Sequence, residues 1–231
     1  MATVLITGAN RGLGLEFCRQ YAEAGWDVIA CCRNIGQAQD LNRLAGQYPN
    51  IQVEKLDVVD FDQIDALAQK LSGRSIDVLL NNAGVYGDSQ GHGFGQLDYR
   101  VWAETLRINT QAPIKMAEAF LPQLQHSDKK LLVNVSSLMG SIADNTSGGS
   151  ILYRSSKAAL NAAMKSLAID LNKLGVGVLI LHPGWVKTDM GGPAALIDAN
   201  ESVSGMRAVI AGFSLAQSGS FIKYDGKLMA W

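Results

Sequence analysis

A tyrosine and a lysine four residues apart, Tyr153 and Lys157, have the types and spacing to transfer a proton together. Residues at positions i and i+4 share one face of a helix, so a helix here would place the phenol beside the ammonium. The ordinary pKa values are about 10 for tyrosine and about 10.4 for lysine, and a neighbouring ammonium favours the phenolate. The pair therefore predicts a tyrosine of lowered pKa that acts as a general acid or base. Alone, it is also typical of a surface cation over an aromatic ring.

A glycine-rich segment near the start of the chain could bind the pyrophosphate of a dinucleotide. Gly8, Gly12 and Gly14 lie between an apolar run and a helical pattern. Gly8 permits a tight turn, and the other two glycines let the backbone approach a pyrophosphate at the positive end of a helix. A plain turn is the alternative to this prediction. The expected site also includes the other residues of the loop, which are Asn10, Arg11 and Leu13.

The residues after the second and third apolar runs should contact the adenosine half of the cofactor. NAD sites usually carry an acidic residue after the second strand, whereas NADP sites carry an arginine. This chain has Arg33 at that place and no acidic neighbour, and Arg11 is a second cation. Because a guanidinium suits a 2′-phosphate, the pattern favours NADP(H) over NAD, although both arginines could simply be solvated. Asp57 could reach the adenine edge, with Val58 beside it.

These residues need a scaffold, and the hydrophobic pattern predicts one. Short apolar runs alternate with helical periodicity, which includes two long helical patterns at about 102–124 and 155–174. This alternation predicts one α/β domain over residues 1–231, a Rossmann fold with a doubly wound, mostly parallel sheet of about seven strands and helices on both faces. Residues 187–204 lack a clear period and are expected to form a substrate loop with a short helix. Strands are expected at 4–7, 28–32, 53–56, 78–81, 131–136 and 178–182.

Composition excludes several other classes of protein. The 231 residues are 48% hydrophobic and 18% charged, which is typical of a globular protein. There are 20 basic and 21 acidic residues, so the basic excess of a nucleic-acid-binding protein is missing. The longest apolar run, at 28–32, is far shorter than the ~20 residues that span a bilayer. We therefore expect a cytoplasmic protein with neither a nucleic-acid partner nor a membrane partner.

Cysteine and histidine usage points to neither disulfides nor metal. The cysteines are Cys18, Cys31 and Cys32, an odd number with no CxxC motif, and they are expected to be buried thiols in a reducing compartment. The histidines His92 and His126 lie far from each other and from His182 in the sequence, so no metal site is expected.

Six motifs occur in order along the chain: TGANRGLG at 7–14, NNAG at 81–84, Asn109, VNVSS at 133–137, YRSSK at 153–157 and PGWVKT at 183–188. Together they resemble the short-chain dehydrogenase/reductase family in its compact single-domain form. Within that family, the segments NTSGGSILYRSSKAALNAAMKSLAIDL, LHPGWVKTDMGG and YDGKLMAW resemble the C-factor/Sniffer-type carbonyl reductases.

The resemblance implies a role for each motif residue. Tyr153 would protonate a carbonyl oxygen as hydride leaves the nicotinamide, and Lys157 would hold the nicotinamide ribose and lower the tyrosine pKa. Ser137 would hydrogen-bond the substrate oxygen and stabilise its developing charge. Asn109 would position a water that links Lys157 to solvent. Further cofactor contacts would come from Asn82, Ala83, Gly84, Pro183, Gly184, Val186 and Thr188.

The catalytic hydroxyl has two candidates. Fifteen residues separate Ser137 from Tyr153, a longer spacing than family members commonly have, so Ser136 is the alternative. Alternation along a strand puts only one of the two serines on the cofactor side. We favour Ser137 because it is the second serine of the VNVSS pattern.

The substrate should lie outside the carboxyl ends of the strands, near the nicotinamide. Trp185 and Met190 suggest an apolar or aromatic ketone or aldehyde, although they could equally well pack the loop. The expected reaction is reduction of a ketone, aldehyde or quinone to an alcohol. The resemblance also implies a homodimer or homotetramer through the two long helical patterns, whose outer faces carry Met116, Ala119, Ala163 and Leu167. The expected substrate walls are Leu138, Met139, Trp185 and Met190.

Two other functions stay open on the same fold, because a fold does not fix a function. One is a non-catalytic NADP-binding regulatory or signalling protein. The presence of Asn109, a candidate serine, Tyr153 and Lys157 argues against it, since a binding module needs no such set. The other is an epimerase or dehydratase, whose larger C-terminal substrate domain has no room in the short segment after Thr188.

Overall fold

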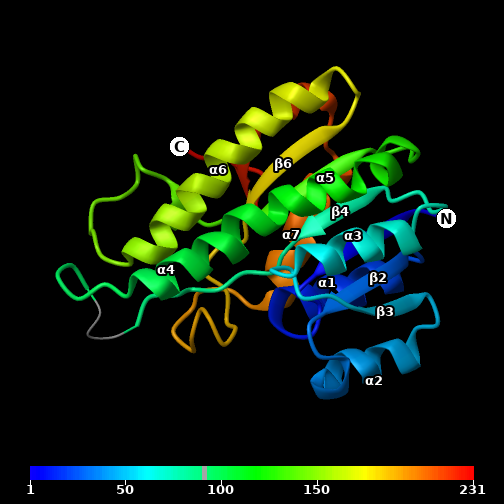
Figure 1. Cartoon of the computed structure of the whole chain (residues 1–231), viewed down its shortest axis with the longest axis horizontal. Coiled ribbons are helices and arrows are strands. Elements are labelled where there is room, and N and C mark those ends of the chain that lie inside the picture. Colours follow the sequence, from blue (N-terminus) through cyan, green and yellow to red (C-terminus); the bar gives the residue numbers. More distant parts are fainter. Residues whose placement is uncertain (90–92) are drawn as a thin grey trace.

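The computed structural model describes residues 1–89 and 93–231, and in this part of the chain seven parallel strands form one sheet (Figure 1). The strand order is β3-β2-β1-β4-β5-β6-β7. The order reverses between β1 and β4, and ligands of such sheets bind outside the carboxyl ends of the strands at that reversal. The strands are β1 Thr3–Thr7, β2 Asp27–Cys32, β3 Ile51–Lys55, β4 Val78–Asn81, β5 Leu131–Val135, β6 Gly177–His182 and β7 Ser220–Lys223.

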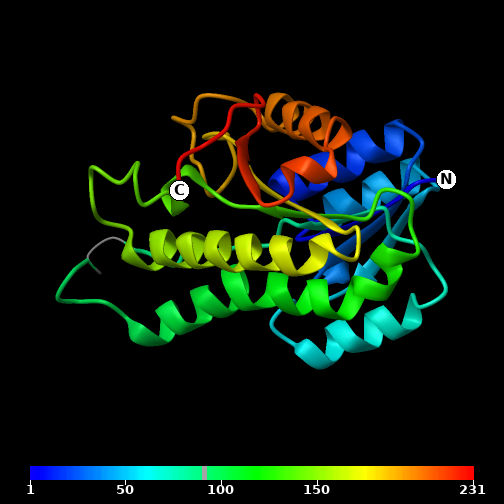
Figure 2. The ribbon, with the colours of Figure 1, turned by 90° about the horizontal axis from the view of Figure 1, so that it is seen from above.

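Helices cover both faces of the sheet, as Figure 2 shows from above. Helices α1, α2 and α7 pack against one face, and α3, α5 and α6 pack against the other. Helix α4 continues into α5 through a π-helical segment, Arg107–Gln111. The helices are α1 Gly12–Glu23, α2 Gln39–Gln47, α3 Phe61–Lys70, α4 Tyr99–Leu106, α5 Ala112–Gln125, α6 Ile151–Asn172 and α7 Ala199–Ala211.

The central strand shows why the apolar runs form this fold. Val4 and Ile6 enter one hydrophobic core and Leu5 enters the other, because successive side chains of a strand point to opposite faces. A strand covered on both sides is apolar on both faces rather than on alternate residues, which is the pattern of a doubly wound parallel sheet. The predicted α/β Rossmann class is therefore confirmed.

Some boundaries differ from the prediction. The sheet of the described residues is parallel throughout, and its seventh strand, Ser220–Lys223, was not located from the sequence because only two of its residues are buried. The expected helix at 102–124 is divided by the π-helical segment, and α7 takes up the end of the expected 187–204 loop. Among the described residues, no helix has both the length and the apolar character to cross a membrane.

Candidate active site

The glycine turn between β1 and α1 forms one wall of the site. Gly8 and Gly12 have φ angles of +66° and +53°, which favour glycine. A Cβ on Gly14 would lie 2.1 Å from the backbone oxygen of Gly8, so only glycine fits there. Arg11, at the N-cap of α1, makes no side-chain cap hydrogen bond, which leaves the first N–H groups of the helix available to a ligand. This cradle fits the pyrophosphate of a dinucleotide.

The segment after β4 is tied to the glycine turn. The side-chain amide of Asn82 donates to the backbone oxygens of Thr7 (2.9 Å) and Gly8 (3.2 Å). The Thr7 hydroxyl in turn accepts from the backbone N–H groups of Asn82 and Ala83. A Cβ on Gly8 would lie 2.9 Å from the Cα of Ala83. The two motifs therefore form one rigid floor where the strand order reverses.

The residues expected to contact adenosine lie at the carboxyl ends of β2 and β3. Arg33 follows β2 and is exposed, and Asp57 is half-buried, with its carboxylate accepting from the backbone N–H of Val59 at 3.3 Å. Arg11 is exposed and pairs with the carboxylate of Asp189 at 2.7 Å. The glycine turn is thus joined to the loop that follows β6 by a surface ion pair.

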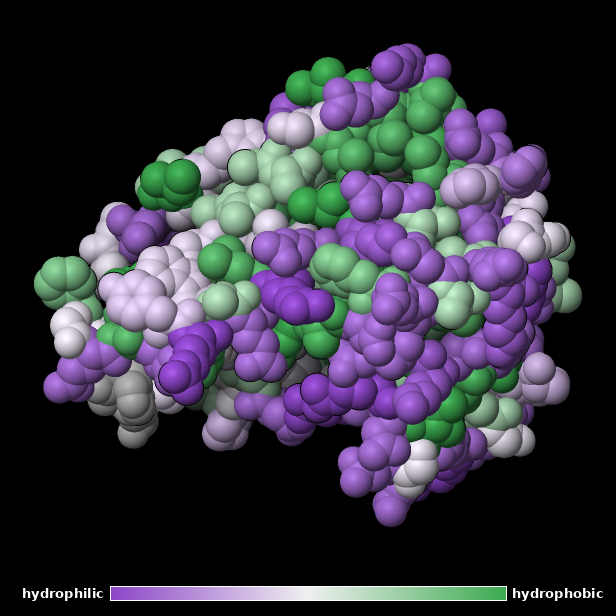
Figure 3. Space-filling model, in the orientation of Figure 1, coloured by the Kyte–Doolittle hydropathy of each residue, from purple (hydrophilic) through white to green (hydrophobic). Residues whose placement is uncertain are grey.

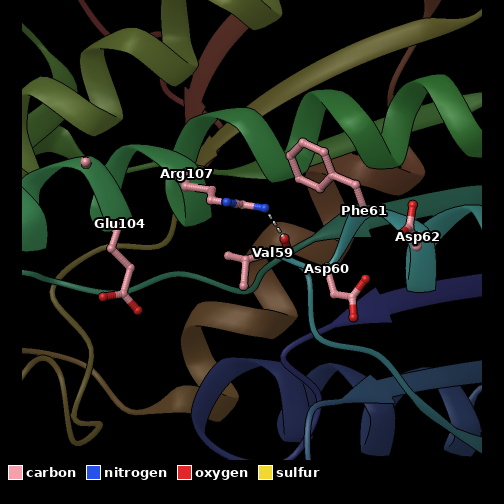
Figure 4. Close-up of a pocket in the computed structure, with 7 residues that line it drawn as sticks. Val59, Asp60, Phe61, Asp62, Glu104 and Arg107 are labelled. Carbon is pink, nitrogen blue, oxygen red and sulfur yellow. Dashed lines mark hydrogen bonds between the residues drawn. The ribbon is translucent and has the colours of Figure 1, made fainter.

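An open groove of about 740 Å³ lies beside this end of the site (Figure 4). Arg107 reaches across the groove, donates to the backbone oxygen of Val59 at 2.8 Å and lies 5.2 Å from the centre of the Phe61 ring. These contacts attach the segment after β3 to the π-helical segment. The groove is lined by Val59, Asp60, Phe61, Asp62, Ala103, Glu104 and Arg107, so Tyr153 and Lys157 take no part in it.

The structure brings Tyr153, Ser137 and Lys157 together. Tyr153 and Lys157 lie on successive turns of α6, both buried, and Ser137 follows β5. The Ser137 side chain lies near enough to the Tyr153 phenol to lower the phenol's pKa. The Lys157 ammonium lies 5.8 Å from the centre of the Tyr153 ring and donates to the backbone oxygen of Val135 at 2.9 Å. A phenol, a hydroxyl and an ammonium therefore meet at the carboxyl end of β5.

Burial sets the acid–base properties of this group. It raises the pKa of Tyr153 to about 12, and the hydrogen bond from Ser137 lowers that pKa by a smaller amount. Burial also lowers the pKa of Lys157 to about 8. The predicted lowering of the tyrosine pKa is wrong for the structure described, because loss of water around the phenol outweighs the other influences. At neutral pH the phenol keeps its proton, which is the form that can donate.

The two candidate serines lie in different surroundings. The Ser136 hydroxyl is buried and donates to the side-chain oxygen of Asn161 at 2.6 Å. The Ser137 hydroxyl lies on the Tyr153 side, where it lowers the phenol's pKa, and it accepts from the backbone N–H of Met139 at 3.1 Å. Of the two, Ser137 is the serine whose side chain influences the pKa of Tyr153, whereas the Ser136 hydroxyl is taken up by Asn161.

Asn109 is fully buried within the π-helical segment. Its amide nitrogen donates to the backbone oxygen of Val85 (2.8 Å) and to the Ser156 hydroxyl (2.9 Å), and its oxygen accepts from the backbone N–H of Val85 (2.9 Å). A Cβ on Gly84 would lie 3.2 Å from the Asn109 oxygen and 3.5 Å from the Lys157 nitrogen. The asparagine therefore holds the backbone after β4 against the lysine.

The expected substrate walls come from two segments, one that follows β5 and one that follows β6. Leu138 and Met139 are half-buried in the 3-10 turn that follows Ser137. Trp185 and Met190 are about half exposed, at 51% and 50%, after β6. The indole N–H of Trp185 donates to the backbone oxygen of Gly191 at 2.8 Å, which fixes the ring over its own loop.

The motif after β6 also meets the glycine turn. A Cβ on Gly12 would lie 3.5 Å from the Thr188 side chain, so Thr188 is adjacent to the start of α1. Gly184 has a φ angle of +84°, and the Pro183 oxygen accepts from the Ser202 hydroxyl at 2.6 Å. Val186 is buried. These residues form the side of the candidate site that faces α7.

Three residues that the sequence does not single out, His182, Tyr86 and Asp88, also contact the site. His182 accepts a hydrogen bond at Nδ1 from the backbone N–H of Leu138 (3.1 Å), and burial lowers its pKa to about 4, so it stays neutral. The Tyr86 ring lies 4.8 Å from the Tyr153 ring, and Asp88 accepts from the Tyr153 backbone N–H. The LHPG and NNAG motifs stand next to these residues, but neither motif indicates their contacts.

His92 lies outside the described residues. Within residues 1–89 and 93–231, no three His, Cys, Asp or Glu side chains gather as a metal site would require. The three cysteines are buried and unbridged, and burial raises the pKa of the Cys18 thiol well above its usual range.

A family model for short chain dehydrogenases matches residues 2–196, and the chain belongs to this family. Myxococcus xanthus C-signal is 44% identical over 166 residues, which cover 72% of this chain and 99% of that protein. Carbonyl reductase Sniffer of D. melanogaster is 37% identical, with a TM-score of 0.92 and 100% of both chains covered. NADPH-bound carbonyl reductase from chicken fatty liver is 36% identical, with a TM-score of 0.92, 100% of this chain and 99% of that chain covered.

Proposed function

We propose that this protein is an NADPH-dependent reductase that converts a ketone, aldehyde or quinone to an alcohol. The observation that carries the proposal is the buried contact of Tyr153 with Ser137 and Lys157 beside the glycine turn. The resemblance to Sniffer and to the chicken liver carbonyl reductase supports the same chemistry. Chain 1–231 would act as a single domain in a reducing, cytoplasmic setting, in keeping with its unbridged cysteines.

The residues present fit a nicotinamide dinucleotide. The glycine turn and the open N-terminus of α1 would hold the pyrophosphate, and Asp57 and Val58 would contact the adenine. Arg33 would pair with a 2′-phosphate, which supports NADP(H) as the cofactor. Arg11 could join it after releasing Asp189, since an exposed ion pair is worth less than about 1 kcal/mol.

Each side chain of the site would have its own role in the reaction. NADPH, when bound, supplies hydride to the carbonyl carbon. Tyr153 donates its proton to the carbonyl oxygen, and Ser137 donates a hydrogen bond to the same oxygen and stabilises its developing charge. Lys157 holds the ribose hydroxyls of the cofactor. Asn109 keeps the backbone beside Lys157 in place and positions a water through which protons return from solvent.

The substrate class follows from the walls of the site. Leu138, Met139 and the ring of Tyr86 are apolar surfaces near the phenol, and Trp185 and Met190 lie on the loop after β6. Apolar and aromatic walls favour a planar or hydrophobic carbonyl compound over a sugar or a charged acid.

The test is NADPH oxidation at 340 nm against a panel of quinones, aromatic aldehydes and diketones. Wild type should turn over at least one compound, and Tyr153→Phe should lose turnover while it still binds NADPH. Tyr99→Phe is the matched control, because Tyr99 is largely exposed on α4 and should be replaceable without effect. Full turnover in Tyr153→Phe would refute the assigned role.

A second candidate is a non-catalytic NADP-binding signalling protein. The similarity to C-signal, a protein named for signalling, favours it. The same assay separates the two functions, because a signalling protein would bind NADPH tightly and leave the whole panel unreduced.

We also propose a homodimer or homotetramer through α5 and α6. Hydrophobic side chains gather where these helices lie side by side (Figure 3), and Ile169 is 67% exposed on α6. Of the outer residues named from the sequence, Met116 is in fact buried in the core, because its position on α5 faces the sheet. Ala119, Ala163 and Leu167 are partly exposed and could contribute to the interface.

A further inference from the structure

Helix α6, which carries Tyr153, takes its N-terminal cap from a distant segment. The first four N–H groups of a helix have no partner within it, and a carboxylate is among their best caps. Ser150, at the N-cap of α6, has a φ angle of 45° and makes no side-chain cap hydrogen bond. Asp88 instead accepts from the N–H of Leu152 (3.2 Å) and from that of Tyr153 itself (2.8 Å).

The segment 85–88 that supplies this cap is held at its other end by Asn109. Val85 exchanges two hydrogen bonds with the Asn109 side chain, at 2.9 and 2.8 Å. Between Val85 and Asp88, the Tyr86 hydroxyl lies 2.7 Å from the Ser150 hydroxyl, and its ring packs on the Tyr153 ring. The segment is therefore held by hydrogen bonds at both ends and connects the backbone beside Asn109 to the first turn of α6.

We propose that Asp88 is a positioning residue for proton transfer, acting through the backbone N–H of Tyr153. The inference rests on the proposed function, because the position of the phenol matters to the rate only if Tyr153 delivers the proton. Ser137 comes from the end of β5 and Tyr153 from the first turn of α6, so the phenol stays aligned with Ser137 only if that turn is fixed. An uncapped first turn frays, and a displacement of about 1 Å at a reacting group can cost about 100-fold in rate.

Kinetics of Asp88→Ala, Asp88→Asn and Asp98→Ala test this role. Asp98 is the matched control, since its carboxylate also caps a helix with two hydrogen bonds, both accepted by Oδ1, from Arg100 N (2.8 Å) and Val101 N (3.2 Å) of α4. Asp88→Ala should lower kcat about 10- to 100-fold, with the dissociation constant of NADPH unchanged because the glycine turn is untouched. Asp88→Asn keeps one acceptor oxygen and should be intermediate, and Asp98→Ala should keep the wild-type kcat.

Amide hydrogen exchange gives a readout that does not depend on turnover. Exchange at Leu152 and Tyr153 should speed up in Asp88→Ala and stay at the wild-type rate in Asp98→Ala. Equal kcat values in the two alanine variants, or unchanged exchange at Tyr153, would overturn the inference. Retained turnover in Tyr153→Phe would instead defeat the proposed function and the catalytic part of this inference. The exchange rates would still decide whether Asp88 caps α6.

Discussion

Lys157 places an ammonium in the protein interior, and the free-energy cost of burying that charge can be measured. Burial lowers its pKa from 10.5 to about 8. Each pKa unit corresponds to about 1.4 kcal/mol, so the charged lysine destabilises the folded state by about 3 kcal/mol. The Lys157 ammonium donates one hydrogen bond, to the backbone oxygen of Val135.

The pH dependence has a definite sign. Below about pH 8 the lysine is charged in the folded and unfolded states, and the full cost is present. Between about 8 and 10.5 the folded protein loses this proton first, so the unfolded state binds more protons and the free energy of unfolding rises with pH. Lys157→Met removes the titration. Wild type should therefore gain about 2 kcal/mol over this variant between pH 7 and pH 9.5.

Urea unfolding followed by tryptophan fluorescence across this pH range would measure the difference. Lost packing and the lost hydrogen bond in Lys157→Met do not depend on pH, so they cancel in the comparison. Lys165→Met, which removes an exposed ammonium from the same helix, is the matched control. The reasoning would be refuted if the free energy of unfolding of wild type, relative to that of Lys157→Met, stayed constant or fell as the pH rises.

Three other perturbations test the site. Gly14→Ala would place a methyl group 2.1 Å from a backbone oxygen, so thermal unfolding should show a loss of roughly 1–3 kcal/mol and NADPH titration a weaker affinity. Gly46→Ala, with open space around its Cβ, should cause neither loss. Ser137→Ala should lower kcat, with a stability loss of only about 1 kcal/mol from the bond to Met139, whereas Ser136→Ala should lower stability by about 1–3 kcal/mol through its buried hydrogen bond and affect kcat less; the opposite pattern in kcat would exchange their roles. Arg33→Asp should move the NADPH/NADH ratio of kcat/KM towards NADH by repelling the 2′-phosphate; an unchanged ratio would mean that another residue reads the phosphate.

The class of fold could be predicted from the sequence because burial leaves a periodic trace. Strand β1 is buried at every position and has an apolar centre, Val4–Ile6, and the helices between the strands are apolar on one face. Strand β7 leaves almost no trace, since only Phe221 and Ile222 are buried in it. The division of the 102–124 pattern was also invisible, because a π-helical turn keeps the same residue types and changes only the hydrogen-bond spacing.

The candidate site could be predicted only where its members share a motif. Tyr153 and Lys157 are one helical turn apart, so their pairing is local and can be read from spacing. Asp88 and His182 act on backbone groups 65 and 44 residues away, and no spacing rule covers such contacts. The tyrosine pKa was predicted in the wrong direction, because a sequence names the neighbouring charge but not the depth of burial.

The position of β1 at the centre of the sheet has a consequence for synthesis of the chain. Strands β2 and β3 leave the ribosome soon after β1 and can pair along one of its edges. The other edge must wait for β4, which begins at Val78. Until then Val4, Leu5 and Ile6 lie along an open, apolar strand edge, the kind of surface on which chains associate wrongly. The interval between synthesis of β3 and β4 is therefore one in which the edge of β1 is open to wrong association.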